Sequence, residues 1–157
     1  MTKYSAILDE INLAIQSFNR ILAPEYKLAT IDLTDPKSCS TIANVAWDDQ
    51  FWPHKDGPGV YLLFGYKEAQ SDELGLYIGK SSLGHIGTRI YSWLHPHRAT
   101  GVHRVNDAAG EPYVIELISA LPLPDPRLGA LASAIEEHII TTVRGDIHLL
   151  NAVGNAK

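Results

Sequence analysis

The sequence predicts an α/β (α+β) fold: a small central three-stranded, mostly antiparallel sheet flanked by helices, in the order β-β-α-β-α. We expect residues 1–58 to form an N-terminal helical extension and residues 59–157 to form the α/β domain. The first basis is three runs rich in β-branched and aromatic residues. The second is helical spacing of apolar residues after the second run and after the third. The three runs are residues 59–65, 75–79 and 113–119, and the helical segments are 83–94 and 126–144.

The first 22 residues predict an amphipathic helix over residues 4–22, because apolar residues recur there at steps of three and four. Pro24 ends this helix. A short strand is expected at residues 28–33. A second helix is expected at 37–47, where Asp35-Pro36 supplies an N-cap side chain and a proline at the first helical position.

A loop with two prolines and one glycine, residues 48–58, separates the extension from the domain. Residues 67–74 are polar, which predicts a hairpin with a long loop between the first two strands. The helix at 83–94 ends at Pro96. Asp125-Pro126 opens the last helix, which Gly145 ends.

Composition excludes several classes of protein. With 45% hydrophobic and 20% charged residues among 157, the chain is expected to be globular rather than disordered. A single cysteine, Cys39, excludes an internal disulfide framework and a multi-cysteine zinc site. No apolar run approaches the roughly 20 residues that span a bilayer, and the N-terminus lacks a signal-peptide pattern, so we expect a cytoplasmic protein without a membrane partner.

The net charge of −5 is unevenly distributed along the chain. Residues 75–106 contain no Asp or Glu and carry +4, so the remainder carries −9. A local basic segment suits an anionic partner, although chance clustering on a solvated surface explains it equally well. The segment contains Lys80, Arg89, Arg98 and Arg104, together with His85, His95, His97 and His103.

Two short motifs in this segment have more ordinary explanations. Residues 79–81, Gly-Lys-Ser, lack the glycine that a phosphate-binding P-loop needs five positions earlier, where Leu74 stands, so ATP or GTP binding is excluded. His95, His97 and His103 lack a well-spaced carboxylate, which favours exposed loop histidines over a metal site.

Two adjacent glutamates lie in the last predicted helix. At 100° per residue, Glu136 falls at the border of the apolar face and Glu137 points away from it. A carboxylate at such a border can be both fixed and hydrated, so Glu136 is either a metal ligand or an ordinary boundary residue. The apolar face comprises Leu128, Ala132, Ile135, Ile139 and Val143.

An ordered set of residues resembles the GIY-YIG nuclease family. Residues 59–61, Gly-Val-Tyr, and residues 77–79, Tyr-Ile-Gly, are similar to the two tripeptides that name the family. Lys80-Ser81 and then an arginine, Arg89, continue the pattern. The family's helix glutamate, followed by aliphatic residues, and its closing asparagine are matched by Glu136 and Asn151.

The resemblance covers about residues 59–155, and the chain departs from the family pattern at four places. The predicted hairpin loop is long, the gap from Glu136 to Asn151 is long, no proline precedes Asn151, and Trp93 stands where many members have histidine or tyrosine. The first 58 residues match nothing in the family.

The resemblance implies a metal-dependent DNA endonuclease, a hydrolase of phosphodiester bonds. It implies that Glu136 holds one divalent cation, Mg²⁺ or Mn²⁺, and that Tyr61 accepts a proton from the attacking water. The pKa of a free tyrosine is near 10, so nearby cations would have to lower it. The implied catalytic residues are Tyr61, Tyr77, Lys80, Arg89, Glu136 and Asn151, of which Tyr77 positions the water or phosphate, Arg89 and Lys80 bind the phosphate, and Asn151 braces the site.

The expected partner is double-stranded or branched DNA, and the N-terminal helix offers a route to a homodimer. Two alternatives stay open: an inactive nuclease-like module that binds nucleic acid, and a small protein-interaction domain that uses its acidic face. The predicted nucleic-acid-binding residues are Lys80, Arg89, His95, His97, Arg98 and Arg104.

Overall fold

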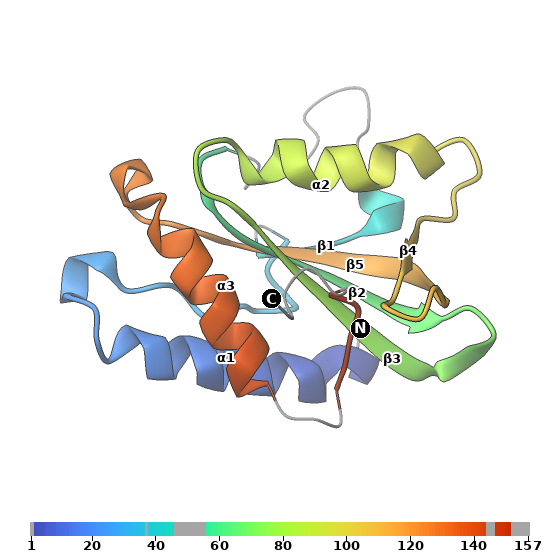
Figure 1. Cartoon of the computed structure of the whole chain (residues 1–157), viewed down its shortest axis with the longest axis horizontal. Coiled ribbons are helices and arrows are strands. Elements are labelled where there is room, and N and C mark those ends of the chain that lie inside the picture. The colour runs from blue at the N-terminus through green and yellow to red at the C-terminus, as the bar shows by residue number, and fades with distance from the viewer. Residues whose placement is uncertain (1, 37, 46–55, 144–146, 152–157) are drawn as a thin grey trace.

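A computed structural model describes residues 2–36, 38–45, 56–143 and 147–151 of the chain. It is a mixed α/β structure in which one twisted sheet lies between helix α2 on one face and helices α1 and α3 on the other (Figure 1). The strand order is β1-β5-β2-β3-β6, and β4 pairs with β5 beside β1.

The centre of the sheet is the predicted antiparallel set of three strands. β2 (Gly59–Lys67) pairs on one side with β3 (Gln70–Ser81) and on the other with β5 (Pro112–Pro122). The expected long hairpin loop at residues 67–74 is wrong, because most of this polar stretch continues β3 outward as an exposed strand.

The expectation of a three-stranded sheet is also wrong, because the described residues form six strands. β1 (Cys39–Thr41) and β4 (Arg104–Asn106) pair antiparallel to β5, and β6 (His148–Leu149) pairs parallel to β3. Strands of two or three residues are too short for alternating polarity to reveal them, and the pairing of β1 and β6 depends on partners that are distant in the sequence.

The three main predicted helices are present, each shorter than the sequence pattern suggested. They are α1 (Ser5–Asn19), α2 (Ile86–Leu94) and α3 (Leu131–Thr142). None of the described helices is long and apolar enough to cross a membrane. Short 3₁₀ helices occupy Thr2–Tyr4, Pro24–Tyr26, Ile42–Asn44, His95–His97 and Pro126–Leu128.

Alternation along β2 creates a hydrophobic core on each face of the sheet. Val60, Leu62 and Phe64 pack with α1 and α3, whereas Tyr61 and Leu63 pack with α2. The apolar face of α1 is therefore covered by the chain's own sheet and by α3, which leaves that face unavailable for a homodimer. The division at residue 58 stays a prediction, although α1 shares its core with β2.

The expected strand at residues 28–33 does not form. Two asparagines of α1 take the place of a strand partner: Asn12 binds both the N–H and the C=O of Ile31, and Asn19 does the same for Leu28, at 2.8–2.9 Å. These bonds satisfy the backbone of an irregular segment that buries Leu28 and Ile31.

The expected helix at residues 37–47 is wrong where the structure describes it. Residues 39–41 form β1 and residues 42–44 a 3₁₀ helix, while residues 37, 46 and 47 lie outside the described residues. Cys39 is buried against the core, so pairing with β5 wins over the helix that Asp35-Pro36 would have started.

We predict that Asn12→Ala lowers the free energy of unfolding by about 1–3 kcal/mol, because it leaves both backbone groups of the buried Ile31 without their side-chain partner. Urea unfolding followed by circular dichroism measures the change. Gln16→Ala, an exposed position on the same helix, is the control. Equal stability of the two variants would contradict the role of Asn12.

Candidate active site

Two of the predicted catalytic residues, Tyr61 and Tyr77, lie on the α2 face of neighbouring strands. In the β2–β3 register Tyr61 is opposite Gly79, and the tyrosine ring covers the glycine. A Cβ atom at position 79 would lie 2.2 Å from Cζ and 2.4 Å from the hydroxyl oxygen of Tyr61. Only glycine at position 79 leaves room for the Tyr61 ring. The centroid of this ring lies 6.1 Å from the ring centroid of Tyr77.

Trp93 of α2 completes an aromatic cluster with Tyr61 and Tyr77. Its indole Nε1 donates a hydrogen bond of 3.1 Å to the Tyr61 hydroxyl, and its ring centroid is 5.2 Å from that of Tyr77. The sequence marked Trp93 only as a departure from the family pattern. Its spacing of four residues from Arg89 on one helix was the signal that could have placed it here.

Burial controls the ionisation of both tyrosines. Burial, with a smaller contribution from Tyr77, raises the pKa of Tyr61 well above its ordinary range, and the charge of Arg89 offsets only a small part of this. Burial also raises the pKa of Tyr77, to which the charge of Glu136 adds. The protein's own charges therefore leave both phenols protonated at neutral pH, so its cationic side chains do not by themselves lower the Tyr61 pKa as the sequence-based mechanism requires.

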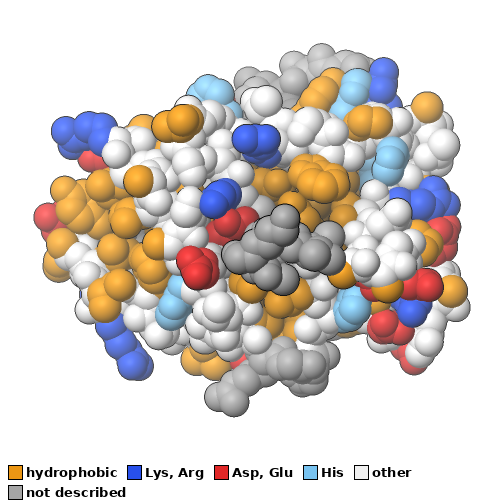
Figure 2. All heavy atoms as spheres, viewed as in Figure 1, with side chains coloured by type: hydrophobic (Ala, Val, Ile, Leu, Met, Phe, Trp, Pro, Cys, Tyr) orange, Lys and Arg blue, Asp and Glu red, His pale blue; other side chains and the backbone are white. Residues whose placement is uncertain are grey.

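Glu136 and Lys80 form an ion pair between α3 and β3. The Lys80 Nζ lies 3.3 Å from Oε2 of Glu136 and 2.9 Å from Oγ of Ser133. The Glu136 side chain is 14% exposed, and Glu137 is exposed, as the helical projection predicted. Figure 2 shows charged side chains beside an exposed hydrophobic patch on this face, between α2 and α3.

Arg89 comes to the same region from α2, and its charge acts on the pKa values of both Tyr61 and Tyr77. An open cavity of about 430 Å³ lies beside it, lined by Lys80, Thr88, Arg89 and the loop from Ser81 to His85. No carboxylate of the described residues lines this cavity, so its charge suits an anion such as a phosphate group.

The side chain of Asn151 forms hydrogen bonds with the backbone of Ile78, which lies between Tyr77 and Gly79 on β3. Its Oδ1 accepts a bond of 2.9 Å from the N–H of Ile78, and its Nδ2 donates one of 2.5 Å to the C=O of Ile78. The side chain thus continues the edge pairing that β6 begins on β3. This geometry is consistent with the bracing role that was expected for Asn151.

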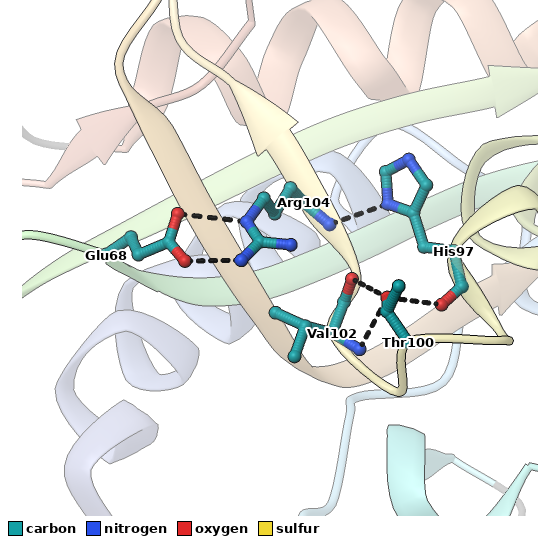
Figure 3. Close-up of polar contacts among 5 residues, drawn as sticks. All are labelled: Glu68, His97, Thr100, Val102 and Arg104. Atoms are coloured by element: carbon teal, nitrogen blue, oxygen red, sulfur yellow. Dashed lines mark hydrogen bonds and ion pairs between the residues drawn. The ribbon is translucent and has the colours of Figure 1, made fainter.

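The other four predicted nucleic-acid-binding residues, His95, His97, Arg98 and Arg104, all described, do not line the cavity at Lys80 and Arg89. Arg104 of β4 makes a bidentate pair with Glu68, with Nε–Oε2 and Nη2–Oε1 distances of 2.9 and 2.5 Å. The backbone N–H of Arg104 donates a hydrogen bond to Nδ1 of His97 (Figure 3). Glu68 lies outside the carboxylate-free stretch of sequence, so sequence inspection overestimated the charge that Arg104 offers to a partner.

Arg98 lies on a third side of the molecule. Its guanidinium binds the C=O of His95 at 3.1 Å and lines a separate cavity of about 640 Å³ near Tyr4 and Glu116. Lys80 and Arg89 are therefore the only members of the predicted binding set, all of which are described, that line the cavity beside the tyrosines.

Glu136 is the one predicted metal ligand, and among the described residues no group of three or more His, Cys, Asp and Glu side chains could hold a metal ion. Among the described residues, the one ion pair of Glu136 is with Lys80, which approaches Oε2. A single, mostly buried carboxylate fits Mg²⁺, which commonly takes one or two carboxylates and completes its shell with waters and phosphate oxygens.

Comparison of the chain with models of protein families, with curated proteins and with solved structures finds no match. The functional argument consequently depends on the residues and their geometry.

We predict that Gly79→Ala destabilises the fold by about 1–3 kcal/mol and displaces the Tyr61 ring, because the added methyl group overlaps that ring. Gly84→Ala is the matched control, since a Cβ there meets only Oγ of Ser81 at 3.5 Å. Thermal unfolding and near-ultraviolet circular dichroism measure the two effects. A Gly79→Ala protein as stable as Gly84→Ala would refute the close contact.

We also predict that Tyr61 does not ionise near pH 10, where an unperturbed tyrosine titrates, because burial raises its pKa. The absorbance change from tyrosinate formation, followed from neutral pH through this step, should have the same amplitude in Tyr61→Phe as in the unmodified protein. A decrease by one tyrosine's share would show that the phenol is ordinary.

Proposed function

We propose that this protein is a metal-dependent endonuclease that hydrolyses phosphodiester bonds in DNA. The observation that carries the proposal is the convergence of two tyrosines, an arginine and a lysine–glutamate pair from β2, β3, α2 and α3 beside one cationic cavity. Phosphodiester hydrolysis needs an oriented water, stabilisation of the charge on the phosphate, and an acceptor for a proton.

The phosphate group would bind in the cavity between Lys80 and Arg89. The planar guanidinium of Arg89 can donate two parallel hydrogen bonds to phosphate oxygens, and Lys80 adds a second positive charge. Thr88 lines the same cavity and can donate a further bond. The attraction between these cationic groups and a phosphate is stronger in such a partly enclosed site than in open water.

Glu136 would hold the divalent cation, which when bound withdraws charge from the phosphate and lowers the pKa of a bound water. Tyr61 and Tyr77 would orient the attacking water through neutral hydroxyl groups, because burial keeps both protonated. For Tyr61 to accept a proton, positive charge that the protein itself does not supply would have to lower its pKa. Trp93 and Gly79 fix the position of its hydroxyl in either case.

Cleavage of supercoiled plasmid and of branched DNA with Mg²⁺ or Mn²⁺, against EDTA, tests this function. We predict that Glu136→Gln and Arg89→Ala each reduce the rate by at least about 100-fold, as expected for removal of a group that stabilises the transition state. Glu137→Gln is the matched control, because this exposed neighbour should leave the rate unchanged.

Cleavage that survives both Glu136→Gln and Arg89→Ala would refute the assigned site. Metal-independent binding of DNA without cleavage would instead favour the nucleic-acid-binding module. Neither binding nor cleavage would favour the protein-interaction domain.

A further inference from the structure

Trp93 presents an exposed aromatic surface next to the candidate active site. Its side chain is 41% exposed, and of the large hydrophobic side chains that are exposed in the described part of the chain it alone is aromatic. The hydrogen bond to Tyr61 and the contact with Tyr77 hold the indole in one orientation. A ring that is already fixed loses little conformational entropy when a ligand packs on it.

The exposed indole forms one wall of a groove between the end of α2 and β4. The groove has a volume of about 370 Å³ and is lined by Trp93, His97, Arg104, Val105 and Asn106. In the part of the chain that the structure describes, no carboxylate lines the groove. Since Trp93 contacts the Tyr61 hydroxyl directly, the groove begins one side chain away from the proposed reaction centre.

Two other residues that line the groove, His97 and Arg104, carry hydrogen-bond donors. Because Nδ1 of His97 accepts the N–H of Arg104, the neutral imidazole carries its hydrogen on Nε2, which Figure 3 shows on the side away from Arg104. Glu68 binds Nε and Nη2 of Arg104, which lines the groove, so its pair with Glu68 leaves Nη1 as a further donor. These donors suit the oxygens of a sugar-phosphate backbone and leave the groove nearly neutral.

We propose that this groove is a stacking subsite for one unpaired nucleotide of DNA, and that it directs the enzyme to substrates with an unpaired nucleotide beside the scissile phosphate. The inference rests on the proposed nuclease function. Bases in a duplex are stacked on each other and cannot lie flat on an indole, whereas a base in a flap, fork, gap or single strand can. Trp93 supplies the stacking surface, and Arg104 and His97 bind the attached backbone.

Binding measured in EDTA tests the subsite without any dependence on cleavage. The probes are a fluorescein-labelled oligothymidylate, a strand of the same length and charge without bases, and a duplex. We expect the strand with bases to bind roughly 5- to 100-fold more tightly than the abasic strand, the range expected for one stacked base. Trp93→Ala should abolish this ratio, while Leu13→Ala, an exposed apolar side chain on α1, should leave it unchanged.

Trp93→Phe keeps an aromatic ring and guards against misfolding of the alanine variant. It should retain part of the preference for bases, and the quenching of tryptophan fluorescence by the oligothymidylate should be smaller than in the unmodified protein. A merely structural role for Trp93 would change stability and not the ratio of the two affinities. Equal binding of the two strands by the unmodified protein, or an unchanged ratio in Trp93→Ala, would overturn the inference.

Failure of the subsite and failure of the nuclease give different results. A base preference that depends on Trp93, without cleavage under any metal condition, would retain the subsite and refute the endonuclease. Cleavage that depends on Glu136, without a base preference, would retain the endonuclease and refute the subsite. No binding of any of the three probes would refute the subsite directly.

Discussion

The antiparallel register of β2 with β3 is the constraint on which the rest of the structure depends. It places the ring of Tyr61 over Gly79, where any side chain would collide with it. A slip of one residue would move Tyr61 into the core beneath α1 and α3 and bring Val60 to the face that α2 covers. The contacts of Tyr61 with Tyr77 and Trp93 exist only in the observed register.

The same sheet also determines where chemistry can occur. β2 is paired on both sides, so its backbone offers nothing to a ligand. β6 and Asn151 cover the edge of β3 at Leu76 and Ile78, but no described strand pairs with that edge at Lys80. Charged groups can be hydrated at this open end while the tyrosines behind them are buried. This explains how the Lys80–Glu136 ion pair lies beside phenols that stay neutral.

The sequence was sufficient for the features that extend over many residues. Alternation and helical spacing located β2, β3, β5 and the three helices, and the helical projection distinguished Glu136 from Glu137. It was insufficient where the outcome depends on a distant partner. The short strands β1 and β6, the pairing of Arg104 with Glu68, and the bond from Trp93 to Tyr61 each join residues that lie far apart in the chain.

In the proposed function Trp93 would connect recognition with chemistry, since one indole both lines the groove and donates to the Tyr61 hydroxyl. A base stacked on that ring would exclude water from one side of the hydroxyl and hold the adjoining backbone near the cavity at Arg89. A regular duplex would reach the cavity but leave the groove empty. The surroundings of Tyr61 would then differ between the two substrates, so an unpaired nucleotide can affect the orientation of the attacking water as well as affinity. Discrimination of this kind requires no separate DNA-binding domain.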